Sequence, residues 1–139
     1  MTSNILFSDI LKLEAANVLY EEVTEKRKVI VRALQDKLDD YIMATNDKME
    51  LVFFDDALEH ILRISRIFRL PRGNAMLIGV GGSGKQSLTK LAAFLMRSEI
   101  FSIEIVKTYN TEAFRADLIK ILMKTGGERT PLTFIFSEA

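Results

Sequence analysis

A single stretch of the sequence combines four glycines within six positions with a lysine directly after them. It reads Gly79-Val80-Gly81-Gly82-Ser83-Gly84-Lys85 and follows a short apolar run at residues 75–78. Glycines this dense would weaken a strand or a helix, so they indicate a loop whose bare backbone approaches a ligand closely. Backbone N–H groups, a helix N-terminus and a lysine side chain together favour an anion. The pattern G-x-x-x-x-G-K therefore predicts a loop that binds a triphosphate.

Two other interpretations fit the same glycines. Gly79, Gly81 and Gly84 match G-x-G-x-x-G, a dinucleotide-binding fingerprint that expects an acidic residue at the end of the next strand. Here Glu104 lies within the expected next strand, which ends near Lys107. A lysine immediately after the last glycine favours the triphosphate loop instead. A glycine-rich turn that binds no ligand is the plainest alternative.

Magnesium coordination departs from the common motif at two positions. The residue after the lysine usually offers Mg²⁺ a hydroxyl, but here it is Gln86, whose amide oxygen is the candidate ligand. Ser87 lies roughly 100° further round the helix and cannot simply substitute. An acidic pair is expected after a later apolar strand, and Ser137-Glu138 stands there. Glu138 is thus the one candidate to orient an attacking water, unless it merely follows its strand into solvent.

Helices and strands are expected to alternate around this loop. Apolar spacings of three and four predict helices, and short β-branched or aromatic runs predict strands. Strands that are apolar throughout indicate a parallel sheet covered on both faces. The predicted helices cover residues 7–44 (one or two helices), 56–68, 85–96 and 112–124, and the predicted strands cover residues 75–78, 101–106 and 132–136.

Helix starts and core faces can also be assigned. Asp56 with Glu59 resembles a capping box, and Thr111 is the expected N-cap of the last helix. His60 is expected to be an ordinary surface histidine rather than a proton carrier. The residues expected to face the core are Ile10, Leu13, Ala16, Leu19, Val23, Ile30, Leu34, Leu38, Tyr41, Leu58, Ile61, Leu62, Ser65, Phe68, Leu88, Leu91, Ala92, Leu95, Phe114, Leu118, Ile121 and Leu122.

Composition indicates one globular domain. The 139 residues are 48% hydrophobic and 27% charged, with a formal net charge of zero. A neutral total gives no broad attraction to nucleic acid or to an anionic membrane, so neither is an expected partner. Without cysteine and with one histidine, a disulfide or a transition-metal site is not expected. The apolar runs are far shorter than the ~20 residues that span a bilayer, and no signal peptide is recognisable.

At residues 49–94 the sequence resembles axonemal dynein heavy chains at the start of their fourth AAA+ module. The lead-in LVFFDDALEHILRI, the turn Arg72-Gly73 and the loop GVGGSGKQSL carry the resemblance together. GKQS in place of GKS or GKT is itself typical of that module, so Gln86 supports the resemblance while it weakens the metal chemistry. The resemblance extends over residues 1–139 and includes Phe101, Tyr109, Phe114, Asp117 and Leu118.

The resemblance implies an α/β P-loop NTPase fold of the AAA+ type, a partial three-layer α-β-α core with parallel strands. Residues 1–48 would be a helical segment leading into the module, and residues 49–139 the N-terminal part of the AAA+ domain, truncated after its third strand. The absent fourth strand would lie between the first and the third. We therefore expect the isolated chain to be marginally stable or partly molten, because Ile78 and Ile135 lose their shared neighbour.

The resemblance also implies a function: a regulatory site for ATP or ADP with Mg²⁺, with weak hydrolysis, in a ciliary microtubule motor built as a ring of six modules. Leu51 and Val52 would flank the adenine, and an arginine from a neighbouring module would complete the site. Expected partners are the other ring modules, dynein light and intermediate chains, and the microtubule through a stalk. The expected location is the cytoplasm, in the cytoskeleton of the ciliary axoneme. A generic P-loop ATPase or kinase, and a structural module that holds nucleotide without turnover or binds none, are the alternatives.

Overall fold

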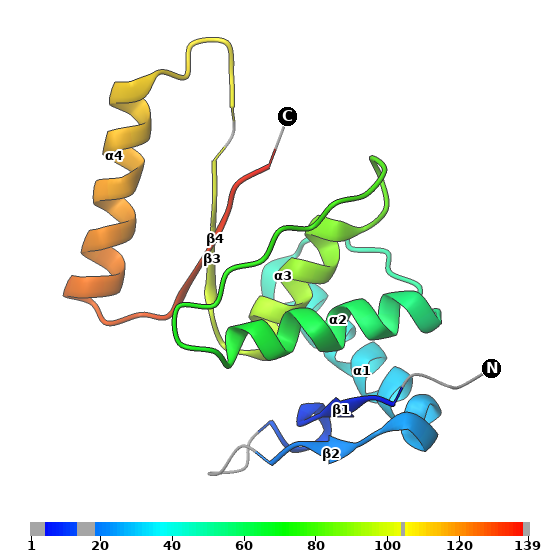
Figure 1. The fold of residues 1–139 in the computed structure, drawn as a ribbon. Helices are drawn as coiled ribbons and strands as arrows, with labels where there is room; N and C mark the ends of the chain where they lie inside the picture. The colour runs from blue at the N-terminus through cyan, green and yellow to red at the C-terminus, as the bar shows by residue number, and fades with distance from the viewer. Residues whose placement is uncertain (1–4, 14–18, 104, 138–139) are drawn as a thin grey trace. The chain divides into compact units, whose positions relative to one another are not determined.

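The structure, a computed structural model, describes residues 5–13, 19–103 and 105–137. Its contacts fall into two units, Met1–Met96 and Arg97–Ala139. The first unit contains a small hairpin and the helices α1, α2 and α3, and the second contains two paired strands with α4 running beside them (Figure 1). This mixture of helices with a parallel strand pair agrees with the predicted α/β class.

The start of the first unit is a hairpin, and the prediction of a continuous helix is wrong for the described residues 7–13 and 19–26. β1 (Phe7–Ser8) pairs antiparallel with β2 (Glu21–Glu22), and two short 3-10 turns, η1 (Ile10–Lys12) and η2 (Thr24–Lys26), follow the strands. The reversal lets both ends of the segment reach the core, because Ile10 and Val23 are buried while Leu19 between them is exposed. Ala16 lies outside the described residues.

A buried ion pair attaches this hairpin segment to α2. The carboxylate of Asp9 is almost fully buried and accepts from Nε of Arg69 at 2.9 Å and from Nη2 at 2.8 Å. Val23 N–H also donates to the carbonyl of Leu6 at 2.7 Å, which closes the hairpin. A lone buried carboxylate would be costly, so the segment depends on Arg69 as its counter-ion.

Helix α1 (Arg27–Thr45) has the predicted apolar stripe. Ile30, Leu34, Leu38 and Tyr41 are its buried residues. The helix ends at Asn46, which adopts a left-handed conformation with φ 55° and donates its N–H to the carbonyl of Ile42. Asparagine adopts this conformation at lower cost than most residues, so the helix ends close to the predicted limit of residue 44.

Helix α2 (Asp55–Phe68) matches its predicted range, but the predicted capping box does not form. Phe54 is the N-cap and no side chain caps the helix, so Asp56 is already inside the first turn. Arg27 of α1 instead approaches the start of α2, with ion pairs to Asp55 at 3.0 Å and to Glu59 at 3.6 Å. Acidic residues in the first turn also suit the positive end of the helix dipole.

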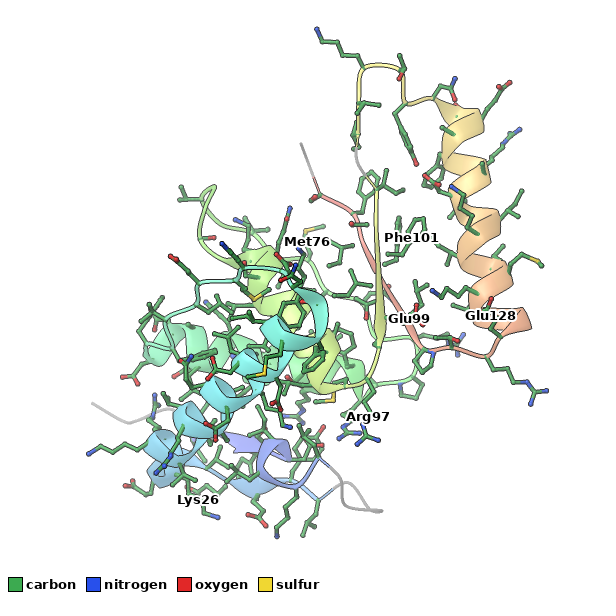
Figure 2. The ribbon with its side chains drawn as sticks, turned by 180° about the vertical axis from the view of Figure 1, so that it is seen from behind. Lys26, Met76, Arg97, Glu99, Phe101 and Glu128 are labelled. Carbon is green, nitrogen blue, oxygen red and sulfur yellow. The ribbon has the colours of Figure 1, made fainter. Side chains whose placement is uncertain are left out.

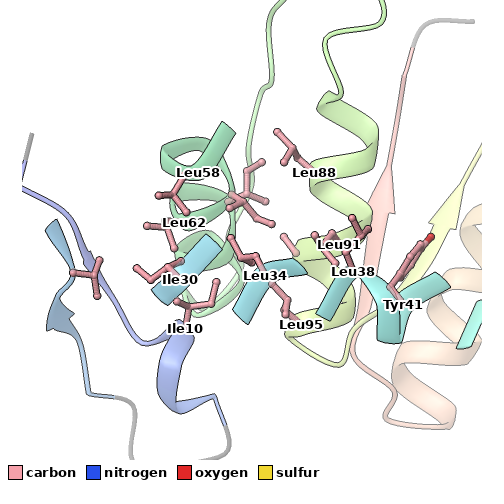
Figure 3. Packing of buried hydrophobic residues seen from close by; sticks show 14 of the residues in the cluster. Ile10, Ile30, Leu34, Leu38, Tyr41, Leu58, Leu62, Leu88, Leu91 and Leu95 are labelled. Atoms are coloured by element: carbon pink, nitrogen blue, oxygen red, sulfur yellow. The ribbon is translucent and has the colours of Figure 1, made fainter. Parts of the chain in front are cut away.

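Helix α3 (Lys85–Leu95) is held in place by the core of the first unit (Figure 3). Its residues Leu88, Leu91, Ala92 and Leu95 are buried as predicted. They pack in one cluster with residues of α1 and α2, among them Leu34 and others that are also fully buried. Each large aliphatic side chain so buried contributes about 1.5–3 kcal/mol. The core therefore fixes α3, and with α3 the loop that precedes it.

The apolar run at residues 75–78 does not form the predicted strand. Met76 (Figure 2) is 85% exposed and Ile78 is 88% exposed. A strand needs a neighbour to bond its N–H and C=O groups, and within the first unit the described strands, β1 and β2, pair only with each other. The run therefore has a strand-forming sequence but no ladder hydrogen bonds in its own unit.

The second unit contains the predicted parallel pair. β3 (Glu99–Ser102) pairs with β4 (Leu132–Ile135), with Glu99 opposite Leu132 and Ser102 opposite Ile135. β4 lies within its predicted range, whereas β3 begins two residues earlier than predicted and ends by Ser102. The residues after it, Ile105 and Val106, are exposed.

Helix α4 (Thr111–Leu122) joins the two strands, as a parallel pair requires. Its N-cap is Asn110, whose side chain accepts from the N–H of Ala113 at 2.9 Å, so the prediction of Thr111 was one residue late. The helix passes into a π-turn, η3 (Met123–Gly127), which ends at Gly126 and Gly127. Leu122 was predicted to face the core but is exposed, because α4 has only two short strands to cover.

No helix in the described part of the chain is both long and apolar enough to cross a membrane.

The unpaired run predicts a specific pattern of amide hydrogen exchange. The amides of residues 75–78 should exchange almost as fast as in an unstructured chain, because none has a ladder hydrogen bond among the described residues. The amides of α3 at Leu91 and Ala92, which are fully buried, should exchange more slowly than those of the run and serve as the internal control. Equal protection of both segments, measured by mass spectrometry or NMR, would show that the run is paired.

Candidate phosphate-binding site

The glycine-rich loop connects the exposed run to α3. The N–H of Ser83 donates to the carbonyl of Val80 at 3.3 Å, which forms a turn. Gly82 and Gly84 have φ values of +74° and +76°, in the left-handed region that glycine adopts at little cost. Two of the glycines are therefore required by the backbone of the loop itself.

The N-terminus of α3 presents free backbone donors to the loop. Gly84 is the N-cap, no side chain caps the helix, and the first turn contains no acidic residue. The first intrahelical bond runs from the N–H of Leu88 to the carbonyl of Gly84, so the N–H groups of Lys85, Gln86 and Ser87 have no partner within the helix. Free N–H groups at the positive end of a helix dipole form a binding site for an anion.

The ammonium group of Lys85 lies inside the loop. Its Nζ donates to the carbonyls of Gly79 at 2.8 Å and Val80 at 2.7 Å, and to Oγ of Ser83 at 3.0 Å. A Cβ added to Gly79 would lie 3.3 Å from that Ser83 oxygen and 3.5 Å from the lysine Nζ, so the loop leaves little room for a side chain there. A full positive charge is thus held beside the free donors of α3.

Leu51 lies beside Gly84, at the end of the loop where α3 begins. Its Cδ2 lies 3.7 Å from the position that a Cβ on Gly84 would occupy. Leu51 is half-buried against the core, whereas its neighbour Val52 is 78% exposed. The structure therefore brings Leu51 to the loop, and the contact of Leu51 and Val52 with a base stays a prediction.

Of the candidate metal and catalytic residues, the structure describes Gln86 but not Glu138. Gln86 is exposed on the first turn of α3, and Ser87 is half-buried next to it. No cluster of three or more acidic, histidine or cysteine side chains in the described residues could hold a metal ion by itself. Mg²⁺ usually takes one or two protein ligands plus phosphate oxygens and waters, so Gln86 as its protein ligand stays a prediction. Glu138 lies outside the described residues, so its role stays a prediction.

Sequence analysis missed a polar cluster beside α3. Oδ2 of Asp47 accepts from Tyr41 Oη at 3.0 Å and from Lys90 Nζ at 3.1 Å. The hydrogen bond from Lys90, and secondly that from Tyr41, lowers the pKa of Asp47. Burial, and secondly the bond to Asp47, raises the pKa of Tyr41. Lys90 lies 43 residues from Asp47 in the sequence, so no local spacing could reveal the pair.

A hollow of about 320 Å³ lies elsewhere in the first unit. It is lined by side chains of the hairpin segment and of α2, including Phe7, Leu62 and Arg63. None of its lining residues belongs to the glycine-rich loop. Residues 79–83 of the loop are exposed, so the backbone donors there are open to the phosphate end of a ligand.

Comparison with known proteins identifies the family. A family model described as "P-loop containing dynein motor region D4" matches residues 49–139. The chain belongs to this dynein family. It is 42% identical to human dynein axonemal heavy chain 6 over 136 residues, and 46% identical to the flagellar outer-arm dynein beta chain of Chlamydomonas reinhardtii over 110 residues. These alignments cover 96% and 79% of this chain but only 3% and 2% of the relatives.

The comparisons confirm the resemblance to axonemal dynein heavy chains. Rat dynein axonemal heavy chain 1 is a further relative, 40% identical over 96% of this chain. The glycine-rich loop at residues 79–85 lies within the matched dynein motor region. The generic P-loop ATPase or kinase outside dynein is therefore set aside. This dynein segment spans only about 3% of the length of such relatives, so their similarity does not by itself assign it the activity of the whole motor.

Gly81 allows a test of whether a ligand approaches the loop backbone in this dynein segment. A Cβ added there would meet no atom within 4 Å, and its φ lies outside the left-handed region. Gly81→Ala should therefore leave the fold intact and change its stability by only about 0.4–1 kcal/mol, in the stabilising direction. If phosphate lies against this backbone, the same methyl group should weaken binding of inorganic tripolyphosphate about tenfold, or 1.4 kcal/mol.

The matched control for this test is Gly126→Ala. A Cβ at Gly126 also meets no atom within 4 Å and its φ is not in the left-handed region, but it lies in the second unit. It should leave tripolyphosphate affinity unchanged in calorimetry. Unchanged affinity in Gly81→Ala as well would mean that phosphate does not approach the loop at this residue.

Proposed function

We propose that this dynein segment binds ATP or ADP through the loop at residues 79–85 and acts as a regulatory nucleotide site with weak hydrolysis. The observation that carries the proposal is the position of Lys85. Its ammonium is held by three loop oxygens directly beside the uncapped N-terminus of α3. Membership in a P-loop dynein family supports nucleotide as the anion.

Phosphate binding in this proposal uses groups that are already placed. The N–H groups at the start of α3 donate to phosphate oxygens, and Lys85 exchanges carbonyl partners for the β- and γ-phosphates. Bound Mg²⁺ would neutralise phosphate charge, with the amide oxygen of Gln86 as its protein ligand. Hydrogen bonds between two charged groups are stronger than bonds to a neutral acceptor. The hydrogen bonds of Lys85 therefore become stronger when phosphate oxygens replace the loop carbonyls.

Weak hydrolysis follows from the residues at the metal and water positions. Gln86 replaces the usual hydroxyl and has a longer side chain to fix. Ser137 replaces the first acid of the expected pair, which leaves Glu138 alone to orient a water. These departures also favour a second candidate function, a module that holds nucleotide with no turnover at all.

The place of the segment in a whole motor belongs to the same proposal. Axonemal heavy chains are its relatives, which supports a role in microtubule-based motility in the cytoplasm, within the cytoskeleton of the ciliary axoneme. The other AAA+ modules of the ring, one of which would contribute an arginine, and the dynein light and intermediate chains would be its partners. The microtubule would be reached only through the stalk. We also propose the division at residues 1–48 and 49–139 and the complete three-layer AAA+ arrangement, which the family match supports.

Lys85→Ala should weaken ATP binding strongly. Hydrogen bonds to charged groups are worth about 1.5–3 kcal/mol, which corresponds to roughly ten- to a hundredfold in Kd. Isothermal titration calorimetry with the 139-residue chain measures the change. Lys37→Ala is the control, because Lys37 makes an exposed ion pair with Asp40 on α1. Equal ATP affinity in the Lys85 variant and the unmodified chain would refute a phosphate-binding role for the loop.

Turnover separates a regulatory site from an ordinary ATPase. Steady-state phosphate release by the 139-residue chain with MgATP should fall far below the ~1–100 s⁻¹ typical of phosphoryl-transfer enzymes such as kinases. The physical reason is the missing metal hydroxyl at Gln86 together with the missing acid at Ser137. A rate within the ordinary range would contradict the regulatory assignment while leaving nucleotide binding intact.

A further inference from the structure

One carboxylate connects the turn after α1 to the helix that bears the phosphate loop. Asp47 follows the helix terminus at Asn46, and its Oδ2 accepts from Nζ of Lys90, on α3, at 3.1 Å. The same oxygen accepts from the hydroxyl of Tyr41 at 3.0 Å. Two donors on one oxygen restrict its position more than either alone would. The polar link thus fixes where the chain leaves α1 relative to α3.

Aromatic packing supports the same link. The ring of Tyr41 meets the ring of Phe94, on α3, edge to face, with centroids 5.4 Å apart and an interplanar angle of 83°. Tyr41 is also buried in the core. Edge-to-face pairs are favourable beyond the area they bury. The packing of the Tyr41 ring therefore fixes the position of its hydroxyl independently of the hydrogen bond to Asp47.

The segment that starts at Asp47 leads to the phosphate loop. Met49 is buried in the core and Leu51 lies 3.7 Å from the Cβ position of Gly84. At its other end, Phe54 bonds α2 through the N–H of Leu58 at 2.9 Å. The segment is thus attached to α3 at one end and to α2 at the other, and Leu51 between these ends lies next to the loop.

We infer that Asp47, bonded to Lys90, is a positioning residue that holds the segment at residues 49–52, so that its side chains Leu51 and Val52 form an apolar wall for the non-phosphate part of the nucleotide. This inference rests on the proposed binding of ATP or ADP. A ligand whose phosphates lie on the N-terminus of α3 extends past the end of the loop, where Leu51 is the bordering side chain. Apolar side chains suit the faces of a nucleotide base, and Lys90 lies on the same helix as Lys85, so the wall and the loop are fixed to one element.

Two ligands distinguish the contribution of the apolar wall from that of the phosphate loop. MgATP has a base, whereas inorganic tripolyphosphate has only the phosphates. Asp47→Ala and Lys90→Met each remove one partner of the link, and Met keeps the length of the lysine chain. Because the two side chains are 41% and 36% exposed, each variant should weaken MgATP binding only about two- to fivefold. Tripolyphosphate affinity should not change, and the double variant should be no weaker than Asp47→Ala alone.

The matched control is the pair Lys37→Met and Asp40→Ala. These residues form an ion pair of 3.0 Å within α1, and their side chains are 48% and 55% exposed, similar to those of the link. The control should leave the ratio of the two affinities unchanged. Far-ultraviolet circular dichroism of each variant verifies that the helices are retained.

Each other outcome has a definite meaning. A parallel loss of MgATP and tripolyphosphate affinity in Asp47→Ala would show a general structural role and overturn the inference. Unchanged MgATP affinity would also overturn it. If the unmodified chain binds tripolyphosphate as tightly as MgATP, the apolar wall contributes nothing to binding and the inference is overturned. The proposed binding of phosphate by the loop would be retained. If the unmodified chain binds neither ligand, the proposed function and this inference fall together.

Discussion

The burial of one face of α3 is the interaction on which the site depends. Leu91 and Ala92 are fully buried among residues of α1 and α2, and Leu88 and Leu95 extend the same face. Protein cores are close-packed, so this face sets the direction and the depth of the helix. The free N–H groups and Lys85 lie at the N-terminal end of α3, so the packing of the helix also determines their position. The loop itself is exposed and has few contacts of its own.

Sequence alone predicted the elements whose signals are local. The apolar stripe of α1 and the ranges of α2 and α3 were correct. The apolar composition of the strands correctly indicated parallel pairing, although it did not say which strands pair. The phosphate loop was recognisable because left-handed glycines and a following lysine are local requirements. Helix caps were less accurate, since Phe54 and Asn110 are the N-caps rather than the neighbouring residues that the patterns favoured.

The failures share a cause, namely dependence on distant partners. Residues 7–26 have a helical spacing, yet the pairing of Asp9 with Arg69 and the burial of both Ile10 and Val23 favour a hairpin. The run at residues 75–78 has a strand-forming sequence but is paired with no strand of the first unit. The link from Asp47 to Lys90 joins residues 43 positions apart. Such features arise from tertiary packing, which overrides local propensity.

The central claim is that phosphate binds the backbone at the start of α3. Its most direct test is an NMR titration of the ¹⁵N-labelled chain with MgATP, followed through the backbone amide signals. The account predicts that the largest shifts fall on Gly81, Gly82 and Gly84 to Ser87, where the free donors lie, while amides of α4 change little. Shifts centred on the hollow beside Phe7 and Arg63, or no shifts at saturating nucleotide, would contradict it.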